Sequence, residues 1–147
     1  MNVTIGSCVM IGWLVISTCV VICAPQILSD DNAFLKGFVN HEFLGFMGVI
    51  VTITLASAGN LIIELNKMSE KIGKDVFPKT KRSVKDSAYY LIAFLVMSVF
   101  LVILKPVLTN TPQGEAIANS LAIALILASI MALTDLTRTA FNLEPIN

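Results

Sequence analysis

The chain has 147 residues, of which 56% are hydrophobic and 14% are charged, and its ten basic and ten acidic residues cancel. Compared with a typical soluble domain, the apolar fraction is high and the charge content is low. The composition therefore excludes an ordinary soluble enzyme or a basic nucleic-acid-binding domain. We expect an integral membrane protein in which the helices, or one short loop, would have to supply any chemistry.

Four apolar runs each approach the roughly 20 residues that cross the hydrocarbon core of a bilayer. We place them at residues 7–28, 41–65, 87–108 and 115–136. The first run is not a secretory signal, because no Lys or Arg precedes it and no cleavage site follows it. The sequence thus predicts an all-α integral membrane protein, a single domain over residues 1–147, with four transmembrane helices.

The first run contains the three cysteines of the chain, Cys8, Cys19 and Cys23. Cys19 and Cys23 are four residues apart, so they share a helix face, but a disulfide between them would be strained. We interpret all three as small buried hydrophobic residues.

The second run begins with cap signals and a possible sensing pair. Asn40 is a suitable N-cap, and Glu42 lies in the positive first turn of the helix. His41 beside Glu42 could titrate near neutral pH and sense the outer face. The alternative is a capped and solvated helix start.

Further along the chain, Thr111 before Pro112 predicts the start of the fourth helix in a similar way.

Ser57, Asn60 and Glu64 follow one another at helical spacing along one face of the second run. An amide or carboxylate facing lipid is costly, so this face should contact other helices in a bundle or an oligomer. The alternative is that the face lines a path for ions or water.

The same run carries a ridge of small residues that favours close helix packing, at Gly45, Gly48, Thr52, Ala56 and Gly59.

The second helix is expected to continue beyond the membrane, because Leu65, Met68 and Ile72 keep helical spacing as far as a stop at Gly73. Residues 66–86 form the predicted basic cytoplasmic loop. Pro78 should interrupt any continuous helix there, and Ser83 with Asp86 resembles a capping pair ahead of the third run.

The orientation follows from the distribution of Lys and Arg, which favour cytoplasmic loops. The connection between the second and third runs contains Lys67, Lys71, Lys74, Lys79, Lys81, Arg82 and Lys85, whereas the other two connections contain only Lys36 and Lys105. We therefore expect both termini in the cytoplasm and the second helix to extend into the cytoplasm. The candidate surface for a partner protein is Lys71, Lys74, Lys79, Lys81, Arg82 and Lys85.

The sequence contains no Ser-His-Asp set, phosphate-binding glycine loop or zinc pattern. We expect no enzymatic activity, no catalytic or metal-binding residues and no cofactor. Two functional classes are left open. One is a small homo-oligomeric channel or holin-like pore, and the other is a membrane sensor or anchor that presents its basic loop and helical extension to a cytoplasmic protein or to nucleic acid.

The segment "HEFLGFMGVIVTITLASAGNLIIELNK", with four spans and a basic cytoplasmic turn, resembles the small membrane subunit of the bacterial Kiwa anti-phage defence system. The resemblance implies a multi-pass protein of the bacterial inner membrane that detects phage infection at the envelope. It further implies a homo-oligomer, as a tetramer, that holds or regulates a cytoplasmic DNA-binding effector. The expected partners are other copies of the chain, that effector and the lipid bilayer, with no direct nucleic-acid binding.

Overall fold

The computed structural model describes residues 3–73 and 77–141 of the chain. These residues form α-helices joined by short connections, with one 3-10 turn and no strand. The elements in chain order are α1 (Val3–Cys23), η1 (Pro25–Ile27), α2 (Ala33–Phe38), α3 (His41–Ile72), α4 (Pro78–Leu108) and α5 (Pro112–Phe141).

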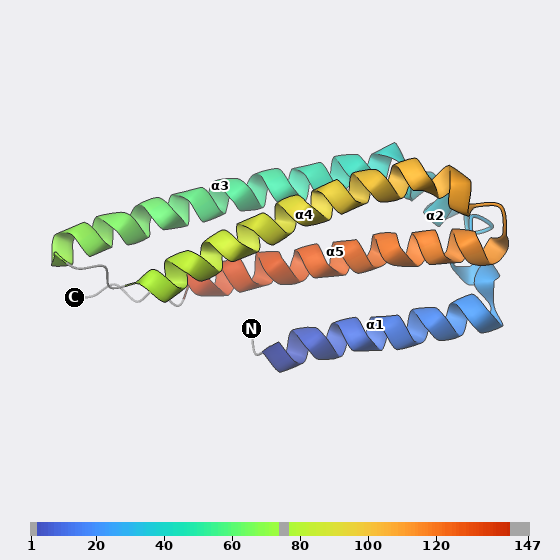
Figure 1. Cartoon of the computed structure of the whole chain (residues 1–147), viewed down its shortest axis with the longest axis horizontal. Helices are drawn as coiled ribbons and strands as arrows, with labels where there is room; N and C mark the ends of the chain where they lie inside the picture. Colours follow the sequence, from blue (N-terminus) through green and yellow to red (C-terminus); the bar gives the residue numbers. More distant parts are fainter. Residues whose placement is uncertain (1–2, 74–76, 142–147) are drawn as a thin grey trace.

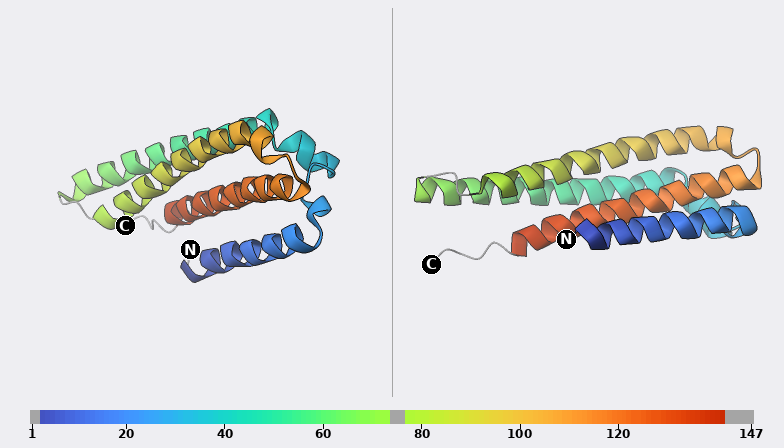
Figure 2. Two further views of the ribbon diagram at one scale, coloured as in Figure 1. Left: turned by 45° about the vertical axis from the view of Figure 1, so that its right-hand side comes forward. Right: turned by 60° about the horizontal axis from the view of Figure 1, so that its bottom comes forward.

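The long helices α3, α4 and α5 lie side by side along the longest axis of the molecule, and α1 packs against α5 (Figure 1). We call the end with α2 and the α4–α5 connection the α2 end. The opposite end, where α3 leads to α4, is the hairpin end. Figure 2 shows the same arrangement from two other directions, with α1 beside the half of α5 that is nearer the α2 end.

Four of the helices described here, α1, α3, α4 and α5, are long and apolar enough to cross a membrane. This confirms the expected multi-pass membrane protein with helical spans. The described part of α1 has 21 residues and α3 has 32. At 1.5 Å per residue the difference is roughly 15 Å. Because α1 ends and α3 begins at the α2 end, the additional turns of α3 project beyond α1 at the hairpin end (Figure 1).

The expected continuation of the second helix as far as Gly73 is confirmed. Gly73 ends α3 in the left-handed conformation, at φ 72°, and its N–H bonds to the carbonyl of Glu70. The basic segment 66–86 is correspondingly not a loop, because residues 66–72 belong to α3 and residues 78–86 belong to α4. Most of the basic residues are therefore carried on rigid helices.

The predicted start of the third helix was wrong. α4 begins at Pro78, and the proposed capping pair Ser83 and Asp86 lies inside this helix. Proline at the first helical position has no N–H to leave unsatisfied and already has a helical φ, so Pro78 starts the helix instead of interrupting the chain. By contrast, the caps predicted at Asn40 and Thr111 are confirmed, since their side chains accept hydrogen bonds from Glu42 N at 2.8 Å and Gly114 N at 3.1 Å.

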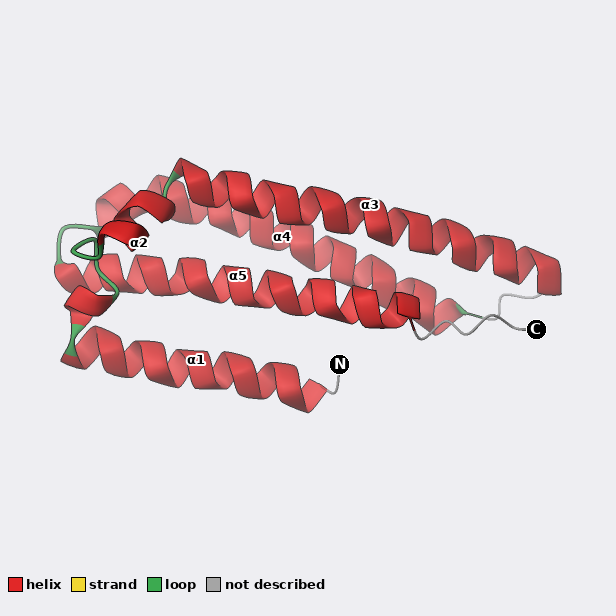
Figure 3. Cartoon of the chain, turned by 180° about the vertical axis from the view of Figure 1, so that it is seen from behind, coloured by secondary structure: helices red, strands yellow, loops and turns green. Residues whose placement is uncertain are grey.

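The first helix is shorter at its end than expected, and its cysteines are not buried. α1 ends at Cys23, five residues before the predicted boundary, and Pro25 follows in the 3-10 turn. Cys8, Cys19 and Cys23 are free and exposed in the single chain. The reason is that, among the described residues, α1 contacts the other long helices mainly through α5, so most of its circumference faces outward (Figure 3).

The core follows one face of α3, which packs against α4 and α5. Phe43, Met47, Val51, Ala58 and Leu65 are buried on this face, with spacings of four or seven residues. Because this face of α3 is buried against α4 and α5, the other faces of α3 are the ones exposed in the single chain.

Candidate functional site

The polar face of α3 does not join α3 to another helix of the same chain. Ser57, Asn60 and Glu64 are all exposed. Ser57 Oγ donates to the Ile53 carbonyl of its own helix at 3.0 Å, and Glu64 pairs with Lys67 at 2.9 Å. Among the described residues, none of the three bonds to another helix. Ser57 borders a groove between α3 and α5, and this face is otherwise open in the single chain, so it is available to a helix of a second copy.

The ridge of small residues on α3 is also open within the single chain. Gly45 and Gly59 are exposed and Gly48 is half-buried. A Cβ atom added to any of these glycines would meet no other atom within 4 Å. The close packing predicted for this ridge is thus not packing against α4 or α5.

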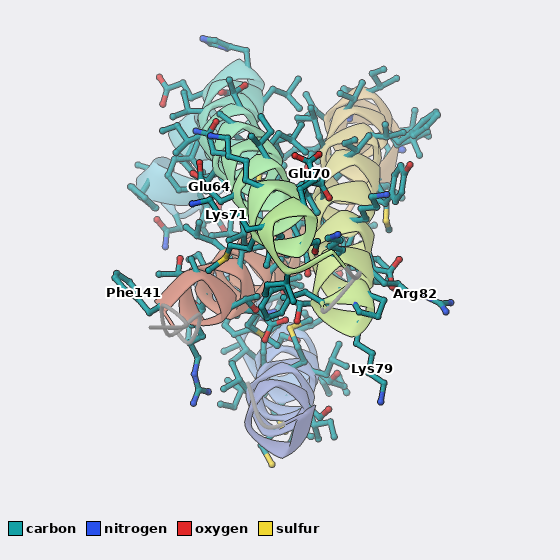
Figure 4. The ribbon with its side chains drawn as sticks, turned by 90° about the vertical axis from the view of Figure 1, so that its left-hand side faces the viewer. Glu64, Glu70, Lys71, Lys79, Arg82 and Phe141 are labelled. Atoms are coloured by element: carbon teal, nitrogen blue, oxygen red, sulfur yellow. The ribbon has the colours of Figure 1, made fainter. Side chains whose placement is uncertain are left out.

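The basic residues of the predicted partner surface lie at the hairpin end (Figure 4). Lys71 on α3 and Lys79, Arg82 and Lys85 on α4 are exposed. Lys81 differs from them, because it is half-buried and its Nζ donates to Ser69 Oγ of α3 at 3.1 Å. Lys81 therefore links the two helices of the hairpin. Lys74 lies outside the described residues.

Acidic residues are interspersed among these cations. Glu64 pairs with Lys67 within α3, and Arg82 Nε lies 3.9 Å from Asp86 within α4, with all four side chains more than half exposed. Such exposed pairs contribute little to stability. Lys71 on α3 and Lys79 on α4 are exposed on different sides of the two-helix projection (Figure 4), and Lys85 is exposed further along α4.

His41 and Glu42 lie at the first turn of α3, at the α2 end, and both side chains are exposed. Their position is that of a capped, solvated helix start. No group of three or more metal-ligating side chains occurs among the described residues.

Sequence reasoning missed a buried polar cluster at the α2 end, formed by Asp30, Lys105, Glu115 and Asn119. We call it the α2-end cluster. Lys105 Nζ donates to Asp30 Oδ1 at 2.9 Å and to the Val39 carbonyl at 3.2 Å. Asn119 Nδ2 donates to the same carboxylate oxygen at 3.0 Å and to the Leu28 carbonyl at 2.8 Å.

Glu115 completes the cluster by accepting a hydrogen bond from the Asp30 backbone N–H at 3.0 Å. The cluster therefore ties the connection between α1 and α2 to both α4 and α5. The ion pair is largely buried, since the side chains of Lys105 and Asp30 are 10% and 20% exposed. In the sequence, this cluster is signalled only by Lys105, a lone Lys near the end of an apolar run. The charge pattern places this residue in a connection between two spans.

Burial by itself raises the pKa of Asp30, but its neighbours act in the opposite direction and dominate. Hydrogen bonds from Lys105 and Asn119, with the positive charges of Lys105 and Lys36, lower the pKa below the ordinary 3.8. Asp30 is consequently ionised at neutral pH, which matches its role as the acceptor for an ammonium group.

The fold and these sites define a multi-pass helical membrane protein with a charged helical hairpin at one end and a buried ion pair at the other. No protein-family model, curated protein or solved structure matches the chain.

Proposed function

We propose that this chain is a non-enzymatic sensor or anchor that holds a cytoplasmic protein at the bacterial inner membrane. Its specific form, suggested by the resemblance to the Kiwa membrane subunit, is a homo-oligomeric component of an anti-phage defence complex. The cytoplasmic partner in that form is a DNA-binding effector that the membrane protein holds or regulates.

The observation that carries the proposal is the helical hairpin. The last turns of α3 and the first turns of α4 extend beyond α1 (Figure 1), and Lys79, Arg82 and Lys85 of α4 are exposed. Positive residues beside a span are explained by topology alone, but topology does not require them to be mounted on a rigid two-helix projection. Such a projection offers an acidic protein surface a preformed set of cations.

The test is an affinity purification of the tagged chain from its host in mild detergent, with mass spectrometry of the recovered complex. The variant changes Lys79, Arg82 and Lys85 to Glu. We expect the wild type to recover a soluble protein in a fixed ratio and the variant to recover about tenfold less or lower, since opposed like charges cost several kcal/mol.

The matched control is Lys36→Glu, which reverses an exposed charge at the opposite end of the molecule. It should keep the partner, and the recovery of each variant is compared per chain in the wild-type orientation, a fraction that a topology reporter measures. Equal recovery of the partner by the triple variant would contradict the proposed surface. Unchanged phage plating on a host that lacks the gene would contradict the defence role.

A pore is the second candidate, because Ser57 and Asn60 are exposed on the outer side of α3. Against this function, Val49 and Ile53 on the same side of α3 are apolar and 59% and 60% exposed. A pore-lining face would be polar or small along the whole span. Ion flux through liposomes containing the purified oligomer, reduced by Asn60→Leu, would favour the pore over the anchor.

A further inference from the structure

A pocket of about 380 Å³ lies at the α2 end, where α2, the start of α3 and the end of α4 meet. Two ammonium groups, of Lys36 and Lys105, and the carboxylate of Asp30 line it. Asn40 and Thr109 add an amide and a hydroxyl group, and Val102 contributes to an apolar wall. The pocket therefore combines both signs of charge with uncharged hydrogen-bonding groups.

Lys105 is prepared for a ligand because the fold has already buried and oriented it. The residue is only 8% exposed, and two acceptors, Asp30 Oδ1 and the Val39 carbonyl, hold its ammonium in place. An ammonium group has three N–H donors, so one is available to an oxygen atom in the pocket. Lys36, which is exposed, adds a mobile second cation at the same pocket.

The pocket lies at the level of the boundary between membrane and water. It occurs where α1 has ended and α3 begins, next to the last turn of α4. Ile103, within the lined stretch of α4, and Val99, about one turn before Val102, are 64% and 39% exposed. Exposed apolar side chains thus lie beside the pocket on the membrane-spanning part of α4, as an acyl chain would require.

We propose that this pocket binds the headgroup of a zwitterionic phospholipid. Lys36 and Lys105 take its phosphate, because charge-assisted hydrogen bonds from ammonium to phosphate are strong. Asp30 faces the headgroup ammonium, which explains why a carboxylate lines a pocket that also holds two lysines. Neither a purely anionic nor a purely cationic ligand would satisfy both signs.

The test uses the purified full-length chain in mild detergent, incubated with phosphatidylethanolamine and examined by native mass spectrometry for retained lipid. Lys36→Gln removes an exposed cation that acts on Asp30 only through its charge and makes none of the hydrogen bonds of the buried cluster, so the variant should fold. We expect the apparent affinity for the lipid to fall about tenfold, the loss that corresponds to one hydrogen bond to a charged group. Lys71→Gln, at the hairpin end, is the matched control and should retain lipid as the wild type does.

Separate measurements distinguish the source of the phosphate and the role of Asp30. Inorganic phosphate should produce no comparable thermal stabilisation. If it does, and Lys36→Gln abolishes the effect, the pocket binds free phosphate and the lipid assignment is overturned. Tighter retention of phosphatidylglycerol than of phosphatidylethanolamine would overturn the zwitterionic assignment. Equal lipid retention by Lys36→Gln and the wild type would overturn the site itself.

Discussion

Asp30 is the residue on which the α2 end depends most. Its carboxylate accepts from Lys105 and Asn119, and its backbone N–H donates to Glu115. One short side chain thereby joins the connection after α1 to two other helices. A buried ion pair need not be more stabilising than an apolar contact, but removing one partner leaves the other charge unpaired.

We predict that Asp30→Asn lowers the free energy of unfolding at neutral pH by roughly 3–5 kcal/mol, because Lys105 loses its counter-charge in a site that water reaches poorly. The pH dependence follows from the lowered pKa of Asp30. Between the folded and unfolded pKa values the unfolded state binds more protons, so stability falls as the pH falls. The contribution is fully present above the ordinary pKa of 3.8 and is lost as the pH drops through the lower folded value.

The measurement is thermal unfolding in detergent between neutral pH and pH 3, followed by circular dichroism. Asp30→Asn should lack the part of the acid loss that belongs to this carboxylate. Asp31→Asn, which changes an exposed neighbour, should behave as the wild type does at neutral pH. Parallel acid profiles for the wild type and Asp30→Asn would show that the ion pair has no energetic role.

At the scale of the residue, the sequence predicts contacts between near neighbours in the chain but not contacts between distant positions. The roles of Asn40, Thr111 and Gly73 were predictable because caps act within a few residues of the chain. The bonds from Lys105 and Asn119 to Asp30 join positions 75 and 89 residues apart. No local pattern encodes such a pairing, which exists only once α4 and α5 return to the α2 end.

At the scale of the element, α3 has two different faces. The core face with Phe43 and Met47 packs inside the chain, whereas the ridge with Gly45 and Gly59 is open. Helical spacing predicted the ridge on one long helix, but the core face was not predicted. It could not predict which face the same chain would cover, because that depends on how α4 and α5 pack.

We predict that Gly45→Leu and Gly59→Leu each reduce self-association at least about tenfold while leaving the single chain folded. The open space beside both glycines means that a larger side chain disturbs no contact within the chain. If a second copy approaches this ridge, the larger side chain forces the two backbones apart. Light scattering in mild detergent measures the assembly, and circular dichroism measures the fold.

The control for the ridge is Val107→Leu on α4, where the side chain is 68% exposed and faces away from the bundle. It should leave both assembly and fold unchanged. Oligomers of wild-type size in both glycine variants would exclude the ridge of α3 as the interface between copies.

At the scale of the whole molecule, the two ends differ in how they use charge. The α2 end buries its principal ion pair beneath short connections. The hairpin end carries its cations on the surface of extended helices (Figure 4). Composition and run length predicted the four spans, since both are properties of the chain alone. The sequence predicts the extension of α3 but not that of α4, because a proline between two spans suggests an interruption, whereas Pro78 begins α4.

This asymmetry leads to a prediction about orientation. Lys and Arg near span ends favour the cytoplasmic side. The hairpin end holds Lys67, Lys71, Lys79, Lys81, Arg82 and Lys85, whereas the α2 end holds Lys36 and the buried Lys105. A reporter inserted at Asn110, in the exposed α4–α5 connection, should therefore report the periplasm. A reporter fused after α5 should report the cytoplasm. Changing Lys79, Arg82 and Lys85 together to Gln should raise the inverted fraction, because it removes three of the cations at that end. The opposite pair of reporter signals would place the hairpin outside the cell, where a cytoplasmic partner could not reach it.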